Sequence, residues 1–206
     1  MKPNYTALSF VYDLIDVIYF NRKNRSPRTA LIDIIPDTPV RILDVCAGTC
    51  SNSILIAENK PQAKITALDL SADMLKIAEK KFCKKNIRNI EISVTDACNS
   101  GFPNNSFDII LISLVLHEIN EDLRKSILSE VKRLLTSNGR VIIIEWKQPV
   151  RLFQRIMFTP IKLLEPRGFK KFLQQDLTSY FKQKGFSINE NRNCDYTQVI
   201  VLSITK

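Results

Sequence analysis

The sequence predicts one α/β domain with a mostly parallel, seven-stranded sheet, helices on both faces, an antiparallel last strand and a helical N-terminal lid. Short apolar runs alternate with helical patterns from residue 41 to the end of the chain. A turn of small residues follows the first apolar run, and acidic residues end the first three runs. Such alternation is typical of parallel strands whose two faces are covered by helices.

The individual elements follow from this pattern. Strands are expected at residues 41–46, 63–69, 89–95, 107–113, 139–146, 186–192 and 195–204, and helices at 51–59, 72–85, 121–136 and 172–184. Ser137, Asn138 and Gly139 are typical of a left-handed stop after the helix at 121–136. The last two strands, separated by a turn near Asn193, are expected to pair antiparallel.

Two segments flank the predicted core. Apolar residues with helical spacing in Asn4–Phe20 predict a lid or docking helix, and Ser26-Pro27 predicts the start of a second helix that runs to Ile35. Residues 147–172 carry seven Lys or Arg, one Glu and several large apolar side chains, and are expected to cover the mouth of a site. The predicted layout is an N-terminal helical cap (1–38), a binding core (41–146), a basic amphipathic insertion (147–172) and a C-terminal helix with a strand pair (173–206).

Composition limits the function classes. Five cysteines without a CxxC pair, with one His in the chain, argue against a disulfide scaffold or a zinc site, so no metal is expected. No apolar run reaches the roughly 18 residues of a membrane span, and Met1–Phe10 lacks a signal-peptide pattern, so a cytoplasmic chain is expected.

The net charge of +9 favours anionic partners such as nucleic acid or an acidic membrane surface. The sequence gives no indication of oligomeric state.

The stretch RILDVCAGTC, residues 41–50, organises the predicted site. Its apolar run contains Asp44 and leads into the small residues Cys46, Ala47 and Gly48, before a helix that begins near Ser51. Small residues allow the backbone to approach a ligand, and the first N–H groups of the helix point toward it. A dinucleotide fingerprint needs three glycines and this turn has one, which argues against an NAD-dependent oxidoreductase.

Acidic residues end the next two predicted strands. Asp69 follows Asp44 by 25 residues, close to the spacing at which an acid accepts both ribose hydroxyls of a nucleoside. A helix-capping acid is the alternative, since Ser71 begins the next helix. Asp96 ends the third strand and precedes a loop rich in Asn, Ser, Gly and Pro. Because the carboxyl ends of parallel strands share one edge of a sheet, these acids are expected to meet in one crevice.

The fourth predicted strand ends near Ser113 and leads to a turn that carries His117 and Glu118. His117 is the candidate catalytic residue, because an imidazole can act as a general base near neutral pH. The alternative is a residue that packs or orients the loop.

The motif ILDVCAGTC resembles the first motif of class I S-adenosylmethionine (SAM)-dependent methyltransferases, and LDLSADML, SVTDA, SFD and LVLHEI extend the resemblance over residues 41–146. These pieces are most similar to the ubiquinone/menaquinone C-methyltransferase family and its small-molecule relatives. The chain departs from the family pattern where Cys replaces two glycines of the first motif, and in its LHE loop. The resemblance implies a Rossmann-like fold with SAM as the cofactor.

The resemblance also implies which residues bind SAM. Asp69 would hold the ribose and Asp96 the adenine amino group, while Asp44 and the Gly48 turn receive the methionyl end. The expected binding residues are Asp44, Cys46, Ala47, Gly48, Asp69, Leu70, Met74, Asp96, Ala97 and Ser113. Tyr12 is a candidate for contact near the methionine moiety, or else a helix-packing aromatic.

The expected activity is methyl transfer to a small, hydrophobic or amphiphilic acceptor such as a quinol precursor, a lipid head group or another metabolite. The basic insertion suits transient contact with an anionic membrane surface, or is a solvated connector. RNA methylation is an alternative, but the chain lacks the Asn/Asp-Pro-Pro-Tyr and Pro-Cys elements of such enzymes, so nucleic acid is not the expected partner. A non-catalytic SAM-binding or partner-binding protein is the remaining alternative.

Overall fold

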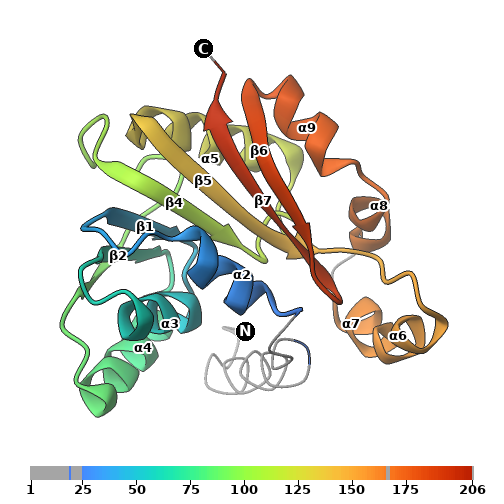
Figure 1. Ribbon diagram of the computed structural model, residues 1–206, viewed down its shortest axis with the longest axis horizontal. Coiled ribbons are helices and arrows are strands. Elements are labelled where there is room, and N and C mark those ends of the chain that lie inside the picture. The colour runs from blue at the N-terminus through green and yellow to red at the C-terminus, as the bar shows by residue number, and fades with distance from the viewer. Residues whose placement is uncertain (1–18, 20–24, 166–167, 206) are drawn as a thin grey trace.

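The fold is that of a computed structural model, which describes residues 19, 25–165 and 168–205 (Figure 1). The predicted helix at Asn4–Phe20, with Tyr12 in it, lies outside the described residues except for Tyr19.

Seven strands form one sheet in the order β3-β2-β1-β4-β5-β7-β6. The strands are β1 (Arg41–Val45), β2 (Lys64–Asp69), β3 (Ile90–Val94), β4 (Phe107–Ser113), β5 (Leu135–Trp146), β6 (Phe186–Asn193) and β7 (Thr197–Ile204). The first five strands pair parallel, and β7 pairs antiparallel with both β5 and β6. The predicted seven-stranded, mostly parallel sheet with an antiparallel last strand is therefore confirmed.

Helices cover both faces of the sheet (Figure 1). The described helices are α2 (Pro27–Ile34), α3 (Ser51–Asn59), α4 (Ala72–Lys85), α5 (Glu121–Leu134), α6 (Leu152–Met157), α7 (Thr159–Leu164), α8 (Phe169–Leu173) and α9 (Leu177–Gln183). The buried β4 side chains alternate between the faces: Ile110 and Ile112 pack in a cluster with residues of α5 and α9, and Ile109 and Leu111 in one with residues of α2 and α3. Burial on both faces explains the continuous apolar runs of the central strands.

The boundary between α5 and β5 differs from the prediction. The helix ends at Leu134 and the strand begins at Leu135, so the predicted left-handed stop at Ser137–Gly139 is wrong. Gly139 is absent from the described residues with positive φ. A Cβ atom on Gly139 would lie 2.7 Å from the Leu135 side chain, which indicates that close packing against Leu135 favours glycine here.

The C-terminal helix also differs from the prediction of one helix at 172–184. It is divided into α8 and α9, because Asp176 caps a new helix by accepting hydrogen bonds from the N–H groups of Thr178 and Ser179. The last strand begins at Thr197 rather than at residue 195.

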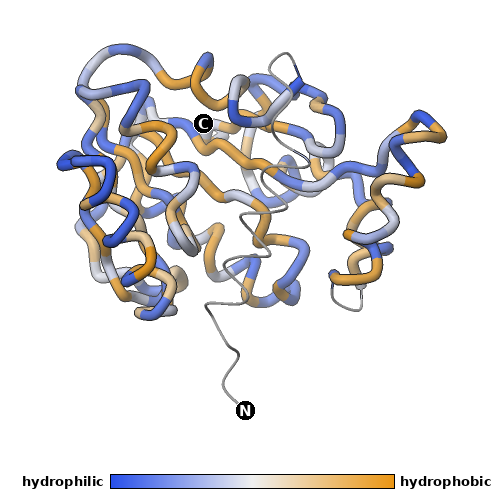
Figure 2. The backbone as a smooth tube through the Cα atoms, turned by 90° about the horizontal axis from the view of Figure 1, so that it is seen from below, coloured by the Kyte–Doolittle hydropathy of each residue, from blue (hydrophilic) through white to orange (hydrophobic). Residues whose placement is uncertain are grey.

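The segment between β5 and α9 contains α6, α7 and α8, which lie beside the sheet at the right of Figure 1. Phe158 and Ile161 anchor α6 and α7 in a buried cluster with Trp146 and Tyr196. In Figure 2 the same segment projects at the right and carries several orange, hydrophobic stretches. No helix among the described residues has the length and apolarity needed to cross a bilayer.

Candidate active site

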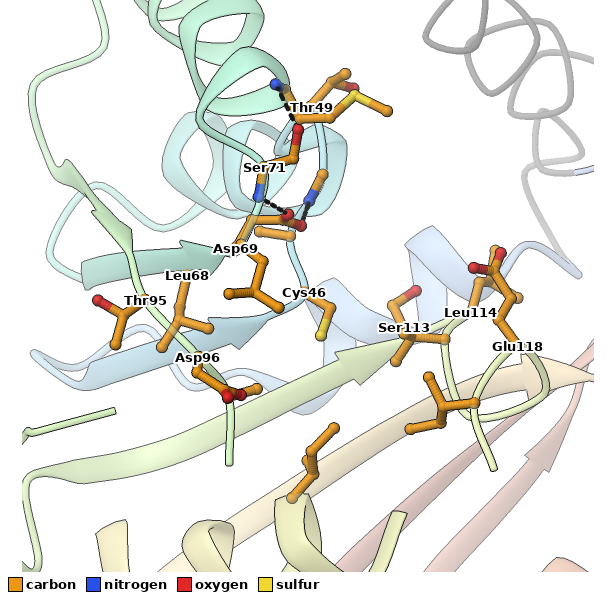
Figure 3. A pocket seen from close by; sticks show the side chains of 18 of the residues that line it. Cys46, Thr49, Leu68, Asp69, Ser71, Thr95, Asp96, Ser113, Leu114 and Glu118 are labelled. Carbon is orange, nitrogen blue, oxygen red and sulfur yellow. Dashed lines mark hydrogen bonds between the residues drawn. The ribbon is translucent and has the colours of Figure 1, made fainter. Parts of the chain in front are cut away.

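A cavity of about 390 Å³ opens at the carboxyl ends of β1, β2, β3 and β4 (Figure 3). This is the edge at which open α/β sheets bind ligands, and the volume is in the range of small-molecule sites. Its lining consists of Cys46, Ala47, Gly48, Thr49, Ser51, Asn52, Leu68, Asp69, Leu70, Ser71, Met74, Thr95, Asp96, Ala97, Cys98, Ser113, Leu114, Val115, Glu118, Ile119, Leu123 and Ile127.

The turn after β1 forms one wall of the cavity through alternating left-handed residues. Cys46, Gly48 and Cys50 have φ angles of 56°, 55° and 59°. Glycine adopts this conformation without strain, whereas another L-residue is destabilised by roughly 1–2 kcal/mol. Cys46 and Cys50 thus keep a backbone that glycine would adopt more easily, and α3 begins directly after the turn.

Asp69, the last residue of β2, joins this turn to the next loop. Its Oδ2 accepts a hydrogen bond from the Gly48 N–H at 2.8 Å, and its Oδ1 accepts one from the Ser71 N–H, also at 2.8 Å. Ser71 in turn caps α4 by accepting from the Met74 N–H. Because a carboxylate has about four acceptor positions, Asp69 retains capacity for ligand hydroxyl groups.

Asp96 lies on the same side of the cavity, after β3 (Figure 3). Its Oδ1 accepts a 2.8 Å hydrogen bond from the Cys98 N–H, which shapes the start of the following loop.

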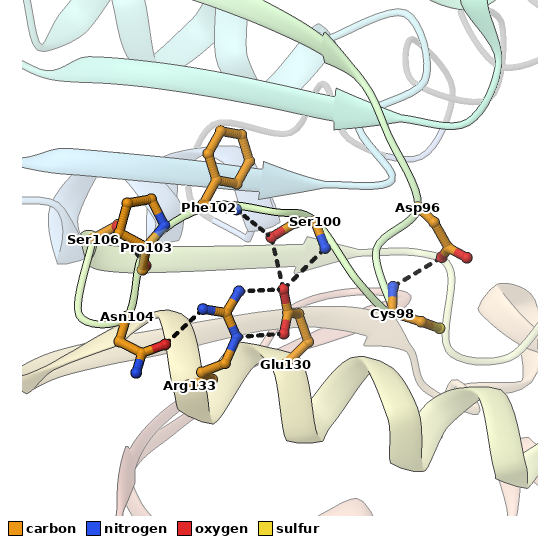
Figure 4. Close-up of polar contacts among 9 residues, drawn as sticks. All are labelled: Asp96, Cys98, Ser100, Phe102, Pro103, Asn104, Ser106, Glu130 and Arg133. Carbon is orange, nitrogen blue, oxygen red and sulfur yellow. Dashed lines mark hydrogen bonds and ion pairs between the residues drawn. The ribbon is translucent and has the colours of Figure 1, made fainter.

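Glu130 of α5 holds that loop in place (Figure 4). Its Oε1 accepts hydrogen bonds from the N–H and the hydroxyl of Ser100, at 2.9 and 2.7 Å, and its two oxygens pair with the Arg133 guanidinium. The guanidinium lowers the pKa of Glu130 to about 2, against an opposing effect of burial, and the Ser100 hydrogen bonds act in the same direction as Arg133. Arg133 also donates to the Asn104 side chain. The loop that follows Asp96 is therefore held by a charged network on α5, in which Glu130 lies 30 residues after Ser100.

Asp44 is buried beneath the turn and does not line the cavity. Its Oδ2 accepts a 2.6 Å hydrogen bond from the Ser53 hydroxyl of α3. Burial raises the pKa of Asp44 to about 7, although the Ser53 hydrogen bond opposes this shift. Direct contact between Asp44 and a ligand in the cavity is not supported by this position, so its predicted binding role stays a prediction.

All five cysteines are free thiols. Burial raises the pKa of Cys46 to about 12, and the charges of Asp69 and Asp44 add to the shift. Burial and Asp44 also raise the pKa of Cys50. Thiols with raised pKa values are poor nucleophiles at neutral pH, so these two residues serve as small turn residues.

His117 lies outside the cavity lining, with its side chain almost fully buried. Its Nδ1 is 2.8 Å from a Glu145 oxygen and its Nε2 is 3.2 Å from a Glu165 oxygen. Burial alone would lower the pKa of His117, but Glu145 and Glu165 outweigh it and raise the pKa to about 10. A group that is protonated at neutral pH is a poor base, so the geometry favours an orienting role over the predicted catalytic one.

One group of side chains near the cavity could hold a metal ion. The ligand atoms of His117, Glu118 and Glu165 lie within 4.8 Å of one another. The Nε2 atom of His117 is already paired with Glu165, so these contacts are accounted for by an ion-pair network. The expectation of a metal-free site stays a prediction.

The structure brings nine of the ten predicted cofactor residues of the core into one cavity lining. These nine are Cys46, Ala47, Gly48, Asp69, Leu70, Met74, Asp96, Ala97 and Ser113. Glu118, Leu123 and Ile127 also line the cavity, and helical spacing in α5 could have indicated the last two. Glu130 does not line the cavity and acts through its contacts with Ser100 and Arg133.

The lining fits a nucleoside with a charged tail. Two carboxylates, Asp69 and Asp96, can accept hydrogen bonds from ribose hydroxyls and an exocyclic amine. Leu70 and Met74 offer apolar surface for a base, and the turn at Gly48 presents backbone groups next to the start of α3.

Three comparisons with known proteins show what the chain is similar to. A family model described as a methyltransferase domain matches residues 42–139. The demethylmenaquinone methyltransferase of Listeria monocytogenes serotype 4a is 29% identical over 166 residues, covering 71% of this chain and 69% of that protein. The Geobacillus stearothermophilus enzyme of the same name is 28% identical over 176 residues, covering 84% and 74%. A SAM-dependent methyltransferase from Aquifex aeolicus shares the fold with a TM-score of 0.75 and 18% identity, over 99% of this chain and 100% of that one.

Proposed function

Since the chain is a class I SAM-dependent methyltransferase, we propose that it methylates a small, hydrophobic acceptor of the quinone class. The observation that carries the proposal is the similarity to demethylmenaquinone methyltransferases over most of the chain. SAM supplies a methyl group that is already activated by its sulfonium, so the chain's task is to hold donor and acceptor in line and to exclude water.

The donor would occupy the part of the cavity formed by the ends of β1, β2 and β3. In this proposal Asp69 accepts hydrogen bonds from the ribose hydroxyls, and Asp96 accepts one from the adenine amino group. The Gly48 turn receives the methionyl end. The support is geometric, because both carboxylates and the turn line one cavity and Asp69 already contacts Gly48.

The acceptor would enter on the side of β4. Ser113, Leu114 and Glu118 lie away from Asp96, across Cys46, in Figure 3. Leu114 and Val115, which line the cavity, would offer apolar contact to a ring. The Glu118 carboxylate, also in the lining, would accept a hydrogen bond from an acceptor hydroxyl. His117 would act as a positioning residue that fixes this turn through Glu145, which also accepts a 2.7 Å hydrogen bond from the Leu116 N–H.

Methyl transfer from labelled SAM tests the proposal. The purified chain is incubated with a demethylated quinol, total RNA or a lipid extract, and the label is followed into each. The proposal expects the label to appear in the quinol. Glu118→Gln should lower the turnover number at least tenfold with little change in SAM affinity. Glu121→Gln, a change at an exposed acid outside the cavity lining, is the control. Label in RNA alone, or SAM binding without transfer, would support the RNA methyltransferase or the non-catalytic alternative instead.

A further inference from the structure

We propose that the segment containing α6 and α7 docks the protein on a bilayer that contains anionic lipids. The docking surface is defined by apolar and basic side chains, namely Val150, Leu152, Phe153, Ile156, Met157, Leu163 and Leu164 with Arg25, Lys147 and Arg151. The inference goes beyond the proposed acceptor, because it concerns a surface outside the cavity lining and does not depend on what is methylated.

The apolar part of the docking surface is unusual in its exposure. Ten large apolar side chains are exposed among the described residues, and seven of them lie between residues 150 and 164. Of the other three, Leu70 and Leu123 line the cavity, and Val94 stands alone at the end of β3. Contiguous exposed apolar side chains mark interaction sites rather than ordinary surface.

The local fold keeps these side chains outward. Leu152, Phe153, Ile156 and Met157 follow the spacing of one helical face of α6, while Phe158 is buried behind them. The Tyr19 hydroxyl donates a 2.7 Å hydrogen bond to the Met157 carbonyl oxygen and so ties the end of α6 to the body. The segment therefore presents an apolar face from an anchored position. Figures 1 and 2 show that its backbone lies at one end of the molecule, beside the sheet.

Basic groups lie next to this apolar face. A second cavity of about 410 Å³ is lined by Arg25, Lys147 and Arg151 together with Val150 at the start of the docking surface. Among the described residues of that lining Asp195 is the one acid, and it lies 3.6 Å from the Arg25 guanidinium. From residue 147 to residue 164 the sequence has no Asp or Glu. Cations beside exposed apolar groups match the phosphate and acyl layers of an anionic bilayer.

The charge distribution also favours a bilayer over a second copy of the chain or a nucleic acid as the partner of the docking surface. Two copies of the docking surface would bring cations against cations, which disfavours self-association. A nucleic acid would use the basic groups and leave Phe153 and Ile156 in water. A bilayer satisfies both parts, since apolar side chains enter the interface while Lys and Arg remain at the phosphates.

Co-sedimentation with lipid vesicles tests the inference. The chain is expected to bind vesicles of mixed phosphatidylcholine and phosphatidylglycerol much more tightly than pure phosphatidylcholine. The double variant Phe153→Ser/Ile156→Ser should bind at least tenfold more weakly, because burial of two large side chains is lost. Lys147→Ala/Arg151→Ala should bind anionic vesicles about 25-fold more weakly, at roughly fivefold per cation.

Matched controls keep the experiment decisive. Val94→Ser removes an exposed apolar side chain elsewhere, and Lys64→Ala/Lys80→Ala removes two exposed cations elsewhere, so both should bind as the unsubstituted chain does. Calorimetry with SAM confirms that each variant is folded. The inference is overturned if anionic vesicles are not bound, if the docking-surface variants bind like the controls, or if Phe153→Ser/Ile156→Ser abolishes a dimer instead. Methyl transfer to a detergent-solubilised quinol reports separately on the proposed function.

Discussion

The carboxylate of Asp69 accepts a 2.8 Å hydrogen bond from the Gly48 N–H, and so joins the end of β2 to the turn after β1. This contact brings together the two parts of the sheet edge that a nucleoside with a methionyl tail would touch. The first prediction tests that role.

Asp69→Ala is expected to weaken SAM binding by at least about tenfold, because hydrogen bonds to a charged acceptor are each worth roughly 1.5–3 kcal/mol. Isothermal titration calorimetry measures the dissociation constant. Asp73→Ala is the matched control, since Asp73 is an exposed acid in the first turn of α4 outside the cavity lining. An unchanged dissociation constant for Asp69→Ala would remove Asp69 from the ribose site.

Glu130→Gln should destabilise the loop that carries Asp96. The folded-state pKa of Glu130 is lowered from 4.5 to about 2, so its stabilising contribution is present above 4.5 and is lost as pH falls toward 2. This shift corresponds to roughly 3 kcal/mol of unfolding free energy, and solvent screening at the partly exposed Arg133 side chain reduces it to roughly 2 kcal/mol. The unsubstituted chain should lose this amount in the window, and Glu130→Gln should not.

Urea denaturation at several pH values measures this difference. Glu79→Gln, at an exposed position of α4, serves as the control. Equal pH dependence in the chain and in Glu130→Gln would contradict the proposed network.

His117→Gln should change the stability profile at the opposite end of the pH scale. The folded-state pKa of His117 is raised from 6.5 to about 10, so its contribution is full below 6.5 and disappears as pH rises toward 10. The groups that face the ring are Glu145, Glu165 and Glu118, with the aromatic rings of Phe169 and Phe172.

Thermal and urea unfolding should show that the unsubstituted chain loses up to about 5 kcal/mol of unfolding free energy between these pH values. His117→Gln should not show this loss. The pH dependence of turnover separates positioning from catalysis. A limb near pH 6.5 in kcat that vanishes in His117→Gln would show that His117 acts as a base and would overturn the positioning role.

Cys46→Gly tests the left-handed turn. Cys46 has a φ of 56°, whereas Cys98 also lines the cavity but is not among the residues with positive φ. Relief of strain should offset the loss of the side chain only at Cys46, so Cys46→Gly should be at least about 1 kcal/mol less destabilising than Cys98→Gly. Equilibrium unfolding compares the two variants, and equal destabilisation would argue against strain at Cys46.

The fold could be predicted because short apolar runs alternate with helical patterns over most of the core, with β3 to β4 as an exception. The clustering of Asp69 and Asp96 followed from the same rule, since parallel strands end at one edge. The α5–β5 boundary could not be predicted, because Ser137-Asn138-Gly139 resembles a helix stop. Only the pairing of Leu135 with Phe107 extends β5 back through Ser137–Gly139.

Other features of the site depend on contacts that sequence spacing does not encode. Glu130 reaches Ser100 across 30 residues, and its importance is invisible in a helix of ordinary polar pattern. Cys46 and Cys50 have positive φ angles, and a cysteine in the sequence does not predict a left-handed backbone. His117 resembled a base in sequence, but its two carboxylate partners come from Glu145 and Glu165, distant positions of the chain.

A crystal structure of the protein with S-adenosylhomocysteine tests the central claim most directly, namely that the cavity at the carboxyl ends of β1 to β4 holds the donor. The account predicts ribose hydroxyls within hydrogen-bond distance of the Asp69 carboxylate, the adenine beside Asp96, and the amino acid tail at the Gly48 turn. A nucleoside bound elsewhere, with Asp69 and Asp96 untouched, would contradict it.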